Sequence, residues 1–414
     1  MIKFNSYTPI TEAKNTHMTH IEDLILDGGV KGARQAINAL RSMRDMLSGN
    51  VKAPIDITTK WDGAPAVFAG IDPTDGEFFV AKKGIFAKSP KVYKNHDDID
   101  ADTAGDLNKK LKLAYDKLKD LGITGVIQGD FMFEKKDLKD EKINGVTHTT
   151  FHPNTIVYAV PKTSKLGKVI NAADIGIVWH TKYSGTTFET MKAEFGVDIV
   201  KDIPRKSRKV WMVDATLRDL SGTATLTDSE TTKLNLNLSA AGKVFRKISS
   251  GVLKDIEENK ELNLILNIYN NLAVRKGVRI TNTRSHATGL VNFVKDRYAK
   301  KIDKLKSPKG KKKQIDNRDE LLKFFSSNNV KNLKLIYDLQ NFIINGKLII
   351  INKLNDLSNM DTFVKTKSGF KVTGVEGFVA IDQTEGGAVK LVDRMEFSTN
   401  NFSSDIIKGW DNPG

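Results

Sequence analysis

The spacing of apolar residues changes twice along the chain, and this limits the possible folds more than any other property of the sequence. Between residues 50 and 214, short apolar runs such as "AVFAG" and "EFFVAKKG" flank turn residues such as "IDPTDG", which predicts antiparallel strands. From 215 to 358 apolar residues recur every three to four positions, which is typical of helices. After Phe363 the strand pattern returns. The chain is therefore expected to leave a β-rich core, form helices, and return to complete that core.

These changes predict an α+β protein, and a chain of 414 residues is long enough for two or three cores. Before the β-rich part a helix is expected over 20–48; within it, a helix is expected over 106–121 and strands over 125–133, 155–160 and 175–181. The predicted organisation has four segments: an N-terminal leader with helices (1–49), the first part of the core (50–214), a basic helical insert (215–358) and the closing strands (359–414).

The composition excludes several classes of protein. The chain has no cysteine, so disulfides and thiolate metal sites are excluded, as expected for a reducing compartment. No run approaches the roughly 18 apolar residues that span a bilayer, and the first residues have no apolar signal region. We therefore expect no membrane partner.

The net charge of +15 is unevenly distributed. Ten Lys or Arg lie between Lys295 and Lys313 against two Asp, a local excess of +8, which indicates a polyanionic partner. Pro308 and Gly310 predict a loop here. Aromatic residues are scarce, so phosphate contacts without base readout are expected; the alternative is a solvated linker or scaffold that touches no nucleic acid. The candidate nucleic-acid-binding residues are Lys300, Lys301, Lys304, Lys306, Lys309, Lys311, Lys312 and Lys313.

Five charged residues occur in a suggestive order on predicted strands. Lys60 opens "KWDG", Lys82 lies in "AKKG", and Asp130 lies in "IQGDF". Much later come Glu376 in "GVEGFVAID" and Lys390 in "AVKLVD". Taken singly, each has a structural explanation, such as a turn, a surface acid or a strand-edge bulge. Their joint order favours a catalytic site.

This order resembles the covalent nucleotidyltransferase superfamily, which comprises ATP-dependent DNA and RNA ligases and mRNA capping enzymes. The resemblance covers residues 50–185 and 363–397, and Lys60–Gly63 and Glu376–Val379 match its motifs well. There are also departures. Asp130 stands where the family usually has Glu, Lys390 is one lysine where the family has two, and the frequent arginine after Lys-x-Asp-Gly is absent.

The resemblance implies an ATP-grasp-like ligase core of antiparallel sheets with a large inserted helical domain. Only 24 residues follow Lys390 in the chain of 414, too few for the C-terminal oligonucleotide-binding (OB) barrel of DNA ligases. ATP would be the substrate and Mg²⁺ or Mn²⁺ the cofactor, with Asp130 and Glu376 as metal ligands. Trp179 is preferred to Tyr158 for stacking on adenine. The implied catalytic residues are Lys60, Asp62 and Lys390, and the implied nucleotide-binding residues are Thr59, Gly63, Lys82, Asp130, Trp179 and Glu376.

The implied function is ligation of polynucleotides, with RNA favoured over DNA. Lys60, once uncharged, would attack the α-phosphate of ATP, and burial and neighbouring cations favour loss of its proton. The lysyl-AMP would pass AMP to a 5′-phosphate, and a 3′-hydroxyl would displace it. Two alternatives stay open: a non-catalytic nucleic-acid-binding or packaged phage protein on a degenerate fold, and a nucleotidyltransferase that modifies an end or a protein without sealing. A monomer is expected.

The first residues, "MIKFNSYTPITEA", resemble the capsid-targeting leader of internal proteins in T-even-like bacteriophages. Those leaders are cut after Ile/Leu-x-Glu, and residues 10–13 fit the rule. The whole chain is also similar to a family of tailed-phage proteins. The resemblance implies the cytoplasm of an infected bacterial host, with packaging in the capsid interior as a further possibility. The alternative is a frayed terminus.

Overall fold

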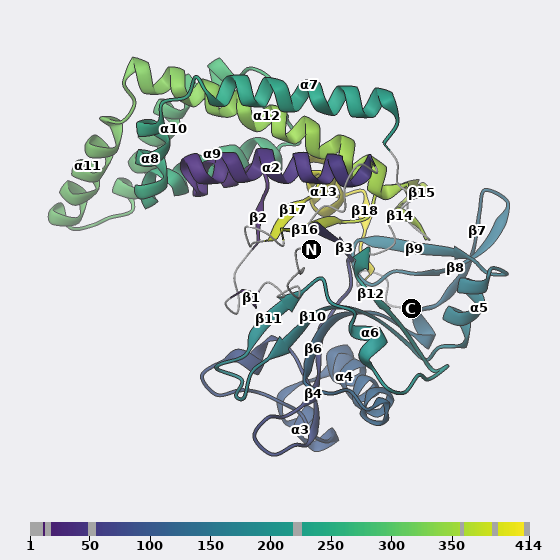
Figure 1. The fold of residues 1–414 in the computed structure, drawn as a ribbon. Helices are drawn as coiled ribbons and strands as arrows, with labels where there is room; N and C mark the ends of the chain where they lie inside the picture. The colour runs from purple at the N-terminus through teal and green to yellow at the C-terminus, as the bar shows by residue number, and fades with distance from the viewer. Residues whose placement is uncertain are drawn as a thin grey trace, which may run out of the picture.

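The computed structural model describes residues 11–12, 18–48, 55–217, 226–356, 360–382 and 388–409. Figure 1 shows a helical lobe at the top and a lobe of sheets below it. The described residues form three sheets, and most of the strand pairs are antiparallel. The expected α+β class is confirmed at this level. No helix in the described ranges combines the length and the apolar character needed to cross a bilayer.

The first sheet lies at the bottom of Figure 1, and helices cover one of its faces. Alternate residues of its strands, including Val67, Ile127 and Trp179, share a hydrophobic core with Leu111 and Ala114 of α4 (Gly105–Leu118). Helices α3 (His96–Asp102) and α6 (Ile199–Asp202) lie beside α4 and β10 respectively. The strand order is β1 (Thr11–Glu12), β11 (Lys192–Phe195), β10 (Ile175–Ser184), β6 (Val126–Glu134), β4 (Ala66–Ile71) and β5 (Phe78–Ala81), and β12 (Val210–Asp214) pairs parallel with β10.

The second sheet joins strands from both ends of the chain. Its order is β13 (Thr216–Leu217), β3 (Ile55–Lys60), β16 (Gly377–Asp382), β17 (Ala388–Leu391) and β2 (Thr19–His20). The third sheet also combines early and late strands and carries α5 (Lys165–Ala172). Its order is β15 (Gly369–Val372), β14 (Asp361–Thr366), β9 (Ile156–Pro161), β8 (Val146–Phe151) and β7 (Lys139–Ile143), and β18 (Ile406–Ile407) pairs with β14. The strands after residue 360 thus return to the β-rich core, as the sequence pattern predicts.

The helical lobe packs on one face of the second sheet. Ile57, Phe378 and Leu391 of that sheet belong to the same hydrophobic core as the helices. The N-terminal helix α2 (Gly29–Leu47) lies in this lobe, against α7, α8 and α12. The other members are α1 (Leu24–Asp27), α7 (Asp228–Phe245), α8 (Ser250–Glu258), α9 (Lys260–Arg275), α10 (Thr283–Asp303), α11 (Pro308–Leu322) and α12 (Ser327–Asn355), while α13 (Arg394–Phe402) contacts α9.

The loop predicted at Pro308 and Gly310 is wrong, because α11 begins at Pro308. Ser307 caps the helix by accepting a hydrogen bond from the backbone N–H of Gly310 at 3.1 Å. Proline is tolerated in the first turn, where its missing N–H would have no helical partner. The proline therefore marks the start of a helix, and the lysines around it project from a rigid element.

A buried ion pair ties α12 to the start of the N-terminal helices. Lys347 Nζ lies 2.8 and 2.9 Å from the two carboxylate oxygens of Glu22, and the two side chains are only 1% and 3% exposed. Arg394 adds a second cation, 3.6 Å from Glu22. Charges this deeply buried need their partners, since an unpaired one loses its solvation without compensation.

We expect Lys347→Met to lower the free energy of unfolding by about 3–5 kcal/mol, because Glu22 is left buried without its main partner. Urea denaturation measures the loss. Lys334→Met is the matched control on the same helix: Lys334 pairs with Asp338 but is 42% exposed, so about 1 kcal/mol or less is expected. If the two variants lose equal free energies of unfolding, the buried ion pair contributes no more to stability than the exposed one.

Candidate functional site

Strand pairing brings Lys60 and Glu376 together across 316 residues of sequence. Lys60 ends β3 and lies opposite Gly377, the first residue of β16, so Glu376 is the next residue outside the strand. Lys60 Nζ forms an ion pair with Glu376 Oε1. The Lys60 side chain is 32% exposed and that of Glu376 is 12% exposed. Burial raises the pKa of Glu376, and the charge of Lys60 opposes that shift.

Lys390 lies on the same face of the second sheet as Lys60. It is opposite Val379 on β16, which is itself opposite Thr58 on β3. Because side chains alternate along a strand, Thr58, Lys60 and Lys390 share a face, opposite to that of Phe378, which packs in the helical core. Burial lowers the pKa of Lys390, and the nearby cation of Lys60 lowers it further.

Asp130 reaches this face from β6 of the first sheet. The turn after Lys60 lies directly on β6, where the backbone N–H of Ala64 donates to the Phe131 carbonyl at 2.9 Å. Gly63 makes this approach possible, since a Cβ there would lie 2.6 Å from Asp130 Cβ and 2.7 Å from Met132 Sδ. Burial raises the pKa of Asp130 to about 7, while the charge of Lys60 opposes the shift.

Asp62 anchors the same turn to the third sheet. Its Oδ2 accepts hydrogen bonds from the backbone N–H groups of Thr155 at 2.7 Å and Ile156 at 2.9 Å, and its Oδ1 accepts from Asn154 at 2.6 Å. Its own backbone N–H donates to the hydroxyl of Tyr158 at 2.8 Å. Burial raises the pKa of Asp62, and these hydrogen bonds oppose the shift. Both oxygens of Asp62 are thus engaged within the protein, and they hold the turn that follows Lys60 in place.

Lys83, the neighbour of the predicted Lys82, is a second cation whose charge acts on Asp130, after that of Lys60. Lys82 forms an ion pair with Asp102 of α3 at 2.8 Å, whereas the charge of Lys83 acts on Asp130 and opposes the rise in its pKa that burial causes. The sequence contains both lysines in "AKKG". The sequence therefore indicated that a lysine follows β5. It could not show which of Lys82 and Lys83 acts on Asp130, because that depends on the direction in which each side chain leaves the end of the strand.

The structure does not bring Trp179 or Thr59 to this cluster. Trp179 is fully buried in the core beneath α4, while Asp130 lies on the other face of the first sheet, beside Val178. Thr59 lies opposite Phe378, on the helical side of the second sheet. The alternative aromatic, Tyr158, lies closer to the turn and stacks on Trp61 with ring centroids 5.1 Å apart.

His180 joins the cluster from β10. It lies two residues after Val178, which is opposite Asp130, so strand alternation places it on the face of Asp130. The strand register shifts just beside it, between Trp179 and Thr181. His180 Nε2 lies 3.9 Å from Asp130 Oδ2, and Nδ1 lies 2.7 Å from Thr181 Oγ1. Burial lowers the pKa of His180 to about 4, so the ring is neutral near pH 7. No sequence motif singled out His180.

Two carboxylates of the cluster are oxygen ligands of the kind that Mg²⁺ prefers. Asp130 and Glu376 come from different sheets, and the charge of Asp130 acts on Glu376. Among the described residues no three His, Cys, Asp or Glu side chains gather into a metal-binding group. Two carboxylates are enough for an ion whose other ligands are water molecules and substrate phosphates. This pair therefore fits Mg²⁺ or Mn²⁺ only when a phosphate ligand also coordinates the ion.

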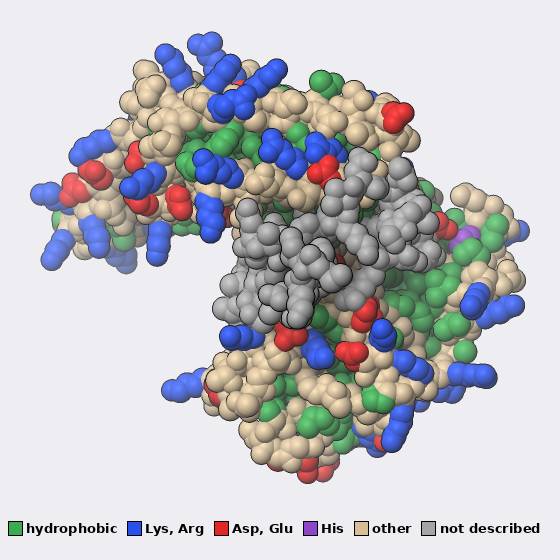
Figure 2. Space-filling view, viewed as in Figure 1, with side chains coloured by type: hydrophobic (Ala, Val, Ile, Leu, Met, Phe, Trp, Pro, Cys, Tyr) green, Lys and Arg blue, Asp and Glu red, His purple; other side chains and the backbone are tan. Residues whose placement is uncertain are grey.

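The predicted basic cluster is an exposed surface at the end of the helical lobe. It covers the last turn of α10 and the first turns of α11, which lie at the left of Figure 1, where Figure 2 shows several Lys and Arg side chains. Lys301 already interacts with two neighbours: its Nζ lies 3.2 Å from Glu261 Oε1 and over the ring of Tyr298. The remaining seven predicted lysines form no ion pair with any residue that the structure describes, and all are exposed: Lys300, Lys304, Lys306, Lys309, Lys311, Lys312 and Lys313.

The predicted leader lies mostly outside the described residues. Of the expected cleavage sequence, only Thr11 and Glu12 are described, and they form β1 against Glu194 and Ala193 of β11. Cleavage and packaging therefore stay predictions.

The chain belongs to a family of unknown function, DUF6267, whose family model matches residues 15–406. No curated protein and no solved structure matches the chain. The match spans the sheets and the helical lobe together, so both parts belong to the family.

We expect stability to fall as the pH rises from about 4 to about 7 because of Asp130, by up to about 1.4 kcal/mol per pH unit. Its pKa is about 7 when folded and about 3.9 when unfolded, so the folded state holds more protons in this window. Asp130→Asn should remove the contribution of Asp130 to this slope in urea denaturation, while Asp62 and Glu376, whose pKa values burial also raises, keep theirs. Asp316→Asn, an exposed control on α11, should keep the whole slope. If the free energy of unfolding changes with pH in the same way for the wild type and Asp130→Asn, Asp130 is not held in this buried environment.

Proposed function

We propose that this DUF6267 protein is an ATP-dependent polynucleotide ligase, with RNA favoured over DNA, that acts through a lysyl-AMP intermediate on Lys60. The observation that supports this function is the convergence of Lys60, Glu376 and Lys390 from one sheet with Asp130 from another. These are the residues that the sequence motifs single out. A hairpin turn, a surface acid and two solvated lysines would have no reason to converge.

The first step needs a neutral amine and a stabilised leaving group. Lys60 Nζ attacks the α-phosphorus of ATP, the bond from that phosphorus to the bridging oxygen breaks, and pyrophosphate leaves. The ammonium group must lose one proton before the attack and a second as the bond to phosphorus forms. The ion-paired Glu376 is the nearest carboxylate, with a pKa raised by burial, and can pass the first proton to solvent; the departing pyrophosphate can take the second. Lys390 and Lys83 supply positive charge around the transferred phosphates.

The second and third steps return Lys60 to its free form. A 5′-phosphate oxygen attacks the lysyl-AMP phosphorus and the bond to Nζ breaks. A 3′-hydroxyl then attacks the activated 5′-phosphate, a phosphodiester forms, and AMP leaves. Throughout, Asp62 and Gly63 hold the Lys60 turn against β9 and β6, so the amine stays aimed at one place while the substrates change.

Asp130 and Glu376 would hold Mg²⁺ or Mn²⁺. When bound, the ion would neutralise phosphate charge and so favour attack by the amine. The exposed lysines of α10 and α11 would hold the polynucleotide backbone. Their exposure supports this role, since each can release a counterion from a phosphate.

The second candidate function is a non-catalytic nucleic-acid-binding or packaged phage protein on the same fold. Two features of the site favour it: both carboxylate oxygens of Asp62 are used within the protein, and Trp179 lies away from the cluster. Such a protein would keep the basic surface and lose adenylation. The cytoplasm of an infected bacterial host fits both candidates.

Incubation with α-labelled ATP and Mg²⁺ is expected to label the wild-type chain covalently, and Lys60→Ala should abolish the label. Denaturing electrophoresis detects it. Lys83→Ala should weaken labelling because it removes charge near Asp130, whereas Lys82→Ala should leave it nearly unchanged because Lys82 pairs with Asp102.

Failure of the wild type to become labelled with either ATP or GTP would favour the non-catalytic candidate. Labelling without sealing of nicked RNA, DNA or hybrid duplexes would favour a transferase that modifies an end or a protein.

Replacing Lys311, Lys312 and Lys313 together by Ala is expected to weaken single-stranded RNA binding and to reduce its salt dependence. The slope of log K against log salt should fall by about 0.7 for each phosphate that the variant no longer neutralises, as measured by fluorescence anisotropy at several salt concentrations. The control replaces Lys142, Lys165 and Lys168, which are equally exposed on the third-sheet lobe. Equal effects of the two triple variants would indicate only a response to net charge.

A further inference from the structure

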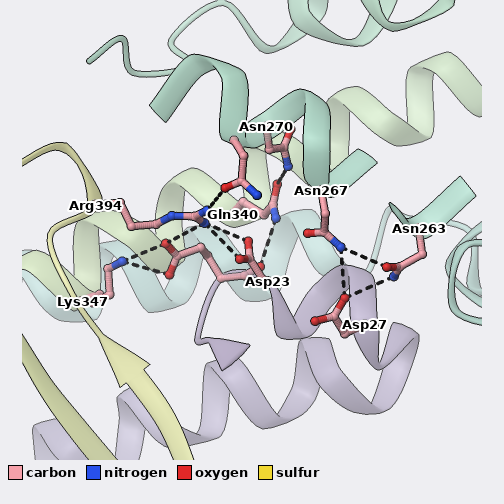
Figure 3. Close-up of polar contacts among 10 residues, drawn as sticks. Asp23, Asp27, Asn263, Asn267, Asn270, Gln340, Lys347 and Arg394 are labelled. Atoms are coloured by element: carbon pink, nitrogen blue, oxygen red, sulfur yellow. Dashed lines mark hydrogen bonds and ion pairs between the residues drawn. The ribbon is translucent and has the colours of Figure 1, made fainter. Parts of the chain in front are cut away.

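Two polar clusters of the protein differ in whether their hydrogen bonds are complete. Figure 3 shows the first, where the helical lobe meets the N-terminal segment. Lys347 there donates to both oxygens of Glu22, and Arg394 lies 3.0 and 3.1 Å from the two oxygens of Asp23. Asp27 accepts hydrogen bonds from two asparagines of α9. Each of these charged groups has a partner within the protein, as expected for a cluster that joins elements of the fold.

The second cluster contains His180, and there one ring nitrogen has a partner while the other has none. Nδ1 lies 2.7 Å from the Thr181 hydroxyl. Nε2 lies 3.9 Å from Asp130 Oδ2, beyond hydrogen-bond distance, and it bonds to none of the residues that the structure describes. The His180 side chain is 28% exposed and that of Asp130 is 22% exposed. A ligand can therefore reach both side chains.

The Thr181 hydroxyl determines which nitrogen of the ring carries the hydrogen. Thr181 is 1% exposed, and among the described residues its hydroxyl bonds only to His180. A buried hydroxyl needs an acceptor for its proton, so Thr181 donates to Nδ1 and the neutral ring carries its hydrogen on Nε2. Burial lowers the pKa of His180 to about 4, and the charge of Lys60 contributes. Near pH 7 the side chain thus presents an uncharged N–H donor beside Asp130.

The position of this donor matches one group of the substrate in the proposed reaction. Lys60 would attack the α-phosphorus of ATP, and its charge acts on both His180 and Asp130. Asp130 would help to hold the ion that binds the phosphates. An oxygen of the attacked phosphate would lie among these three side chains, within reach of Nε2. Because the ring is neutral, it would not compete with the ion for the charge of Asp130.

We propose that His180 is a phosphate-binding residue of this site, and that its Nε2–H donates a hydrogen bond to a non-bridging oxygen of the α-phosphate. This assignment rests on the proposed function, because it takes the nucleotide as the ligand of the cluster. A hydrogen bond to a charged oxygen is stronger than one between neutral groups. Since Thr181 fixes the donor in advance, the donor also stabilises charge that develops while Lys60 attacks.

The test compares AMP, which carries the α-phosphate, with adenosine, which lacks it, in ligand-detected NMR titrations of the full chain with Mg²⁺. His180→Phe keeps a flat ring without nitrogens. It should weaken AMP binding about tenfold, as expected for one hydrogen bond to a charged group, and leave adenosine binding unchanged. His180→Gln, whose amide donates from near the position of Nε2, should recover most of the AMP affinity. The control is His96→Phe on α3: His96 is 45% exposed, so neither affinity should change.

A second measurement needs no variant and decides the question if His180→Phe fails to fold, which melting curves establish. NMR of nitrogen-15-labelled histidine in the wild type should show His180 protonated at Nε2. Its Nε2 signal should shift when AMP is added and stay in place when adenosine is added. An Nε2 signal that does not respond to bound AMP overturns the assignment.

Covalent labelling with α-labelled ATP separates this assignment from the proposed function. If the wild type is labelled but folded His180→Phe binds AMP as tightly as the wild type, the assignment is overturned and the ligase proposal stands. If His180 is required for AMP binding but the wild type is never labelled, the assignment stands and the ligase proposal fails. The assignment is also overturned if the wild type does not bind AMP, or if folded His180→Phe loses AMP and adenosine affinity equally.

Discussion

The pairing of β3 with β16 positions the ion pair at the centre of the candidate site. It joins residues 55–60 to residues 377–382, and it places Lys60 opposite Gly377 with Glu376 beside it. One face of these strands packs in the helical core through Ile57 and Phe378, so a register slip of one residue would turn Lys60 into that core. The cost of closing such a long loop grows only slowly with its length. Because the intervening chain folds into cores of its own, the two strands can meet without a long ordered linker.

Each charged group of the site would be unfavourable if it were buried alone. Burial alone disfavours the charged forms of Asp130, Glu376 and Lys390, and only the presence of opposite charges offsets this. The turn after Lys60 provides the required proximity: Gly63 lets it lie on β6, and Asp62 ties it to β9. A cluster that costs stability, held by residues with no other evident purpose, is more typical of a functional site than of a structural ion pair.

The sequence allowed the α+β class, the helical excursion and the returning strands to be predicted, because periodicity reports which face of an element is buried. It also singled out Lys60, Glu376, Asp130 and Lys390, which the fold brings together. It could not distinguish Lys82 from Lys83, since that choice depends on how the chain leaves β5. Trp179 was expected to face a nucleotide, but strand alternation places it beneath α4, and no sequence motif singled out His180. The loop predicted at Pro308 failed because proline both breaks helices and begins them.

The protein has several separate hydrophobic cores, and elements that share one core are expected to move together. The second sheet shares its core with the helical lobe, so Lys60, Glu376 and Lys390 belong to one body with the basic surface of α10 and α11. Asp130, His180 and Lys83 belong to the first sheet, whose core is separate. The turn at Asp62 and Gly63 joins the two bodies at the site. A polynucleotide held by the helical lobe would therefore keep a fixed position relative to Lys60, while any opening between the lobes would change the position of Asp130 relative to both.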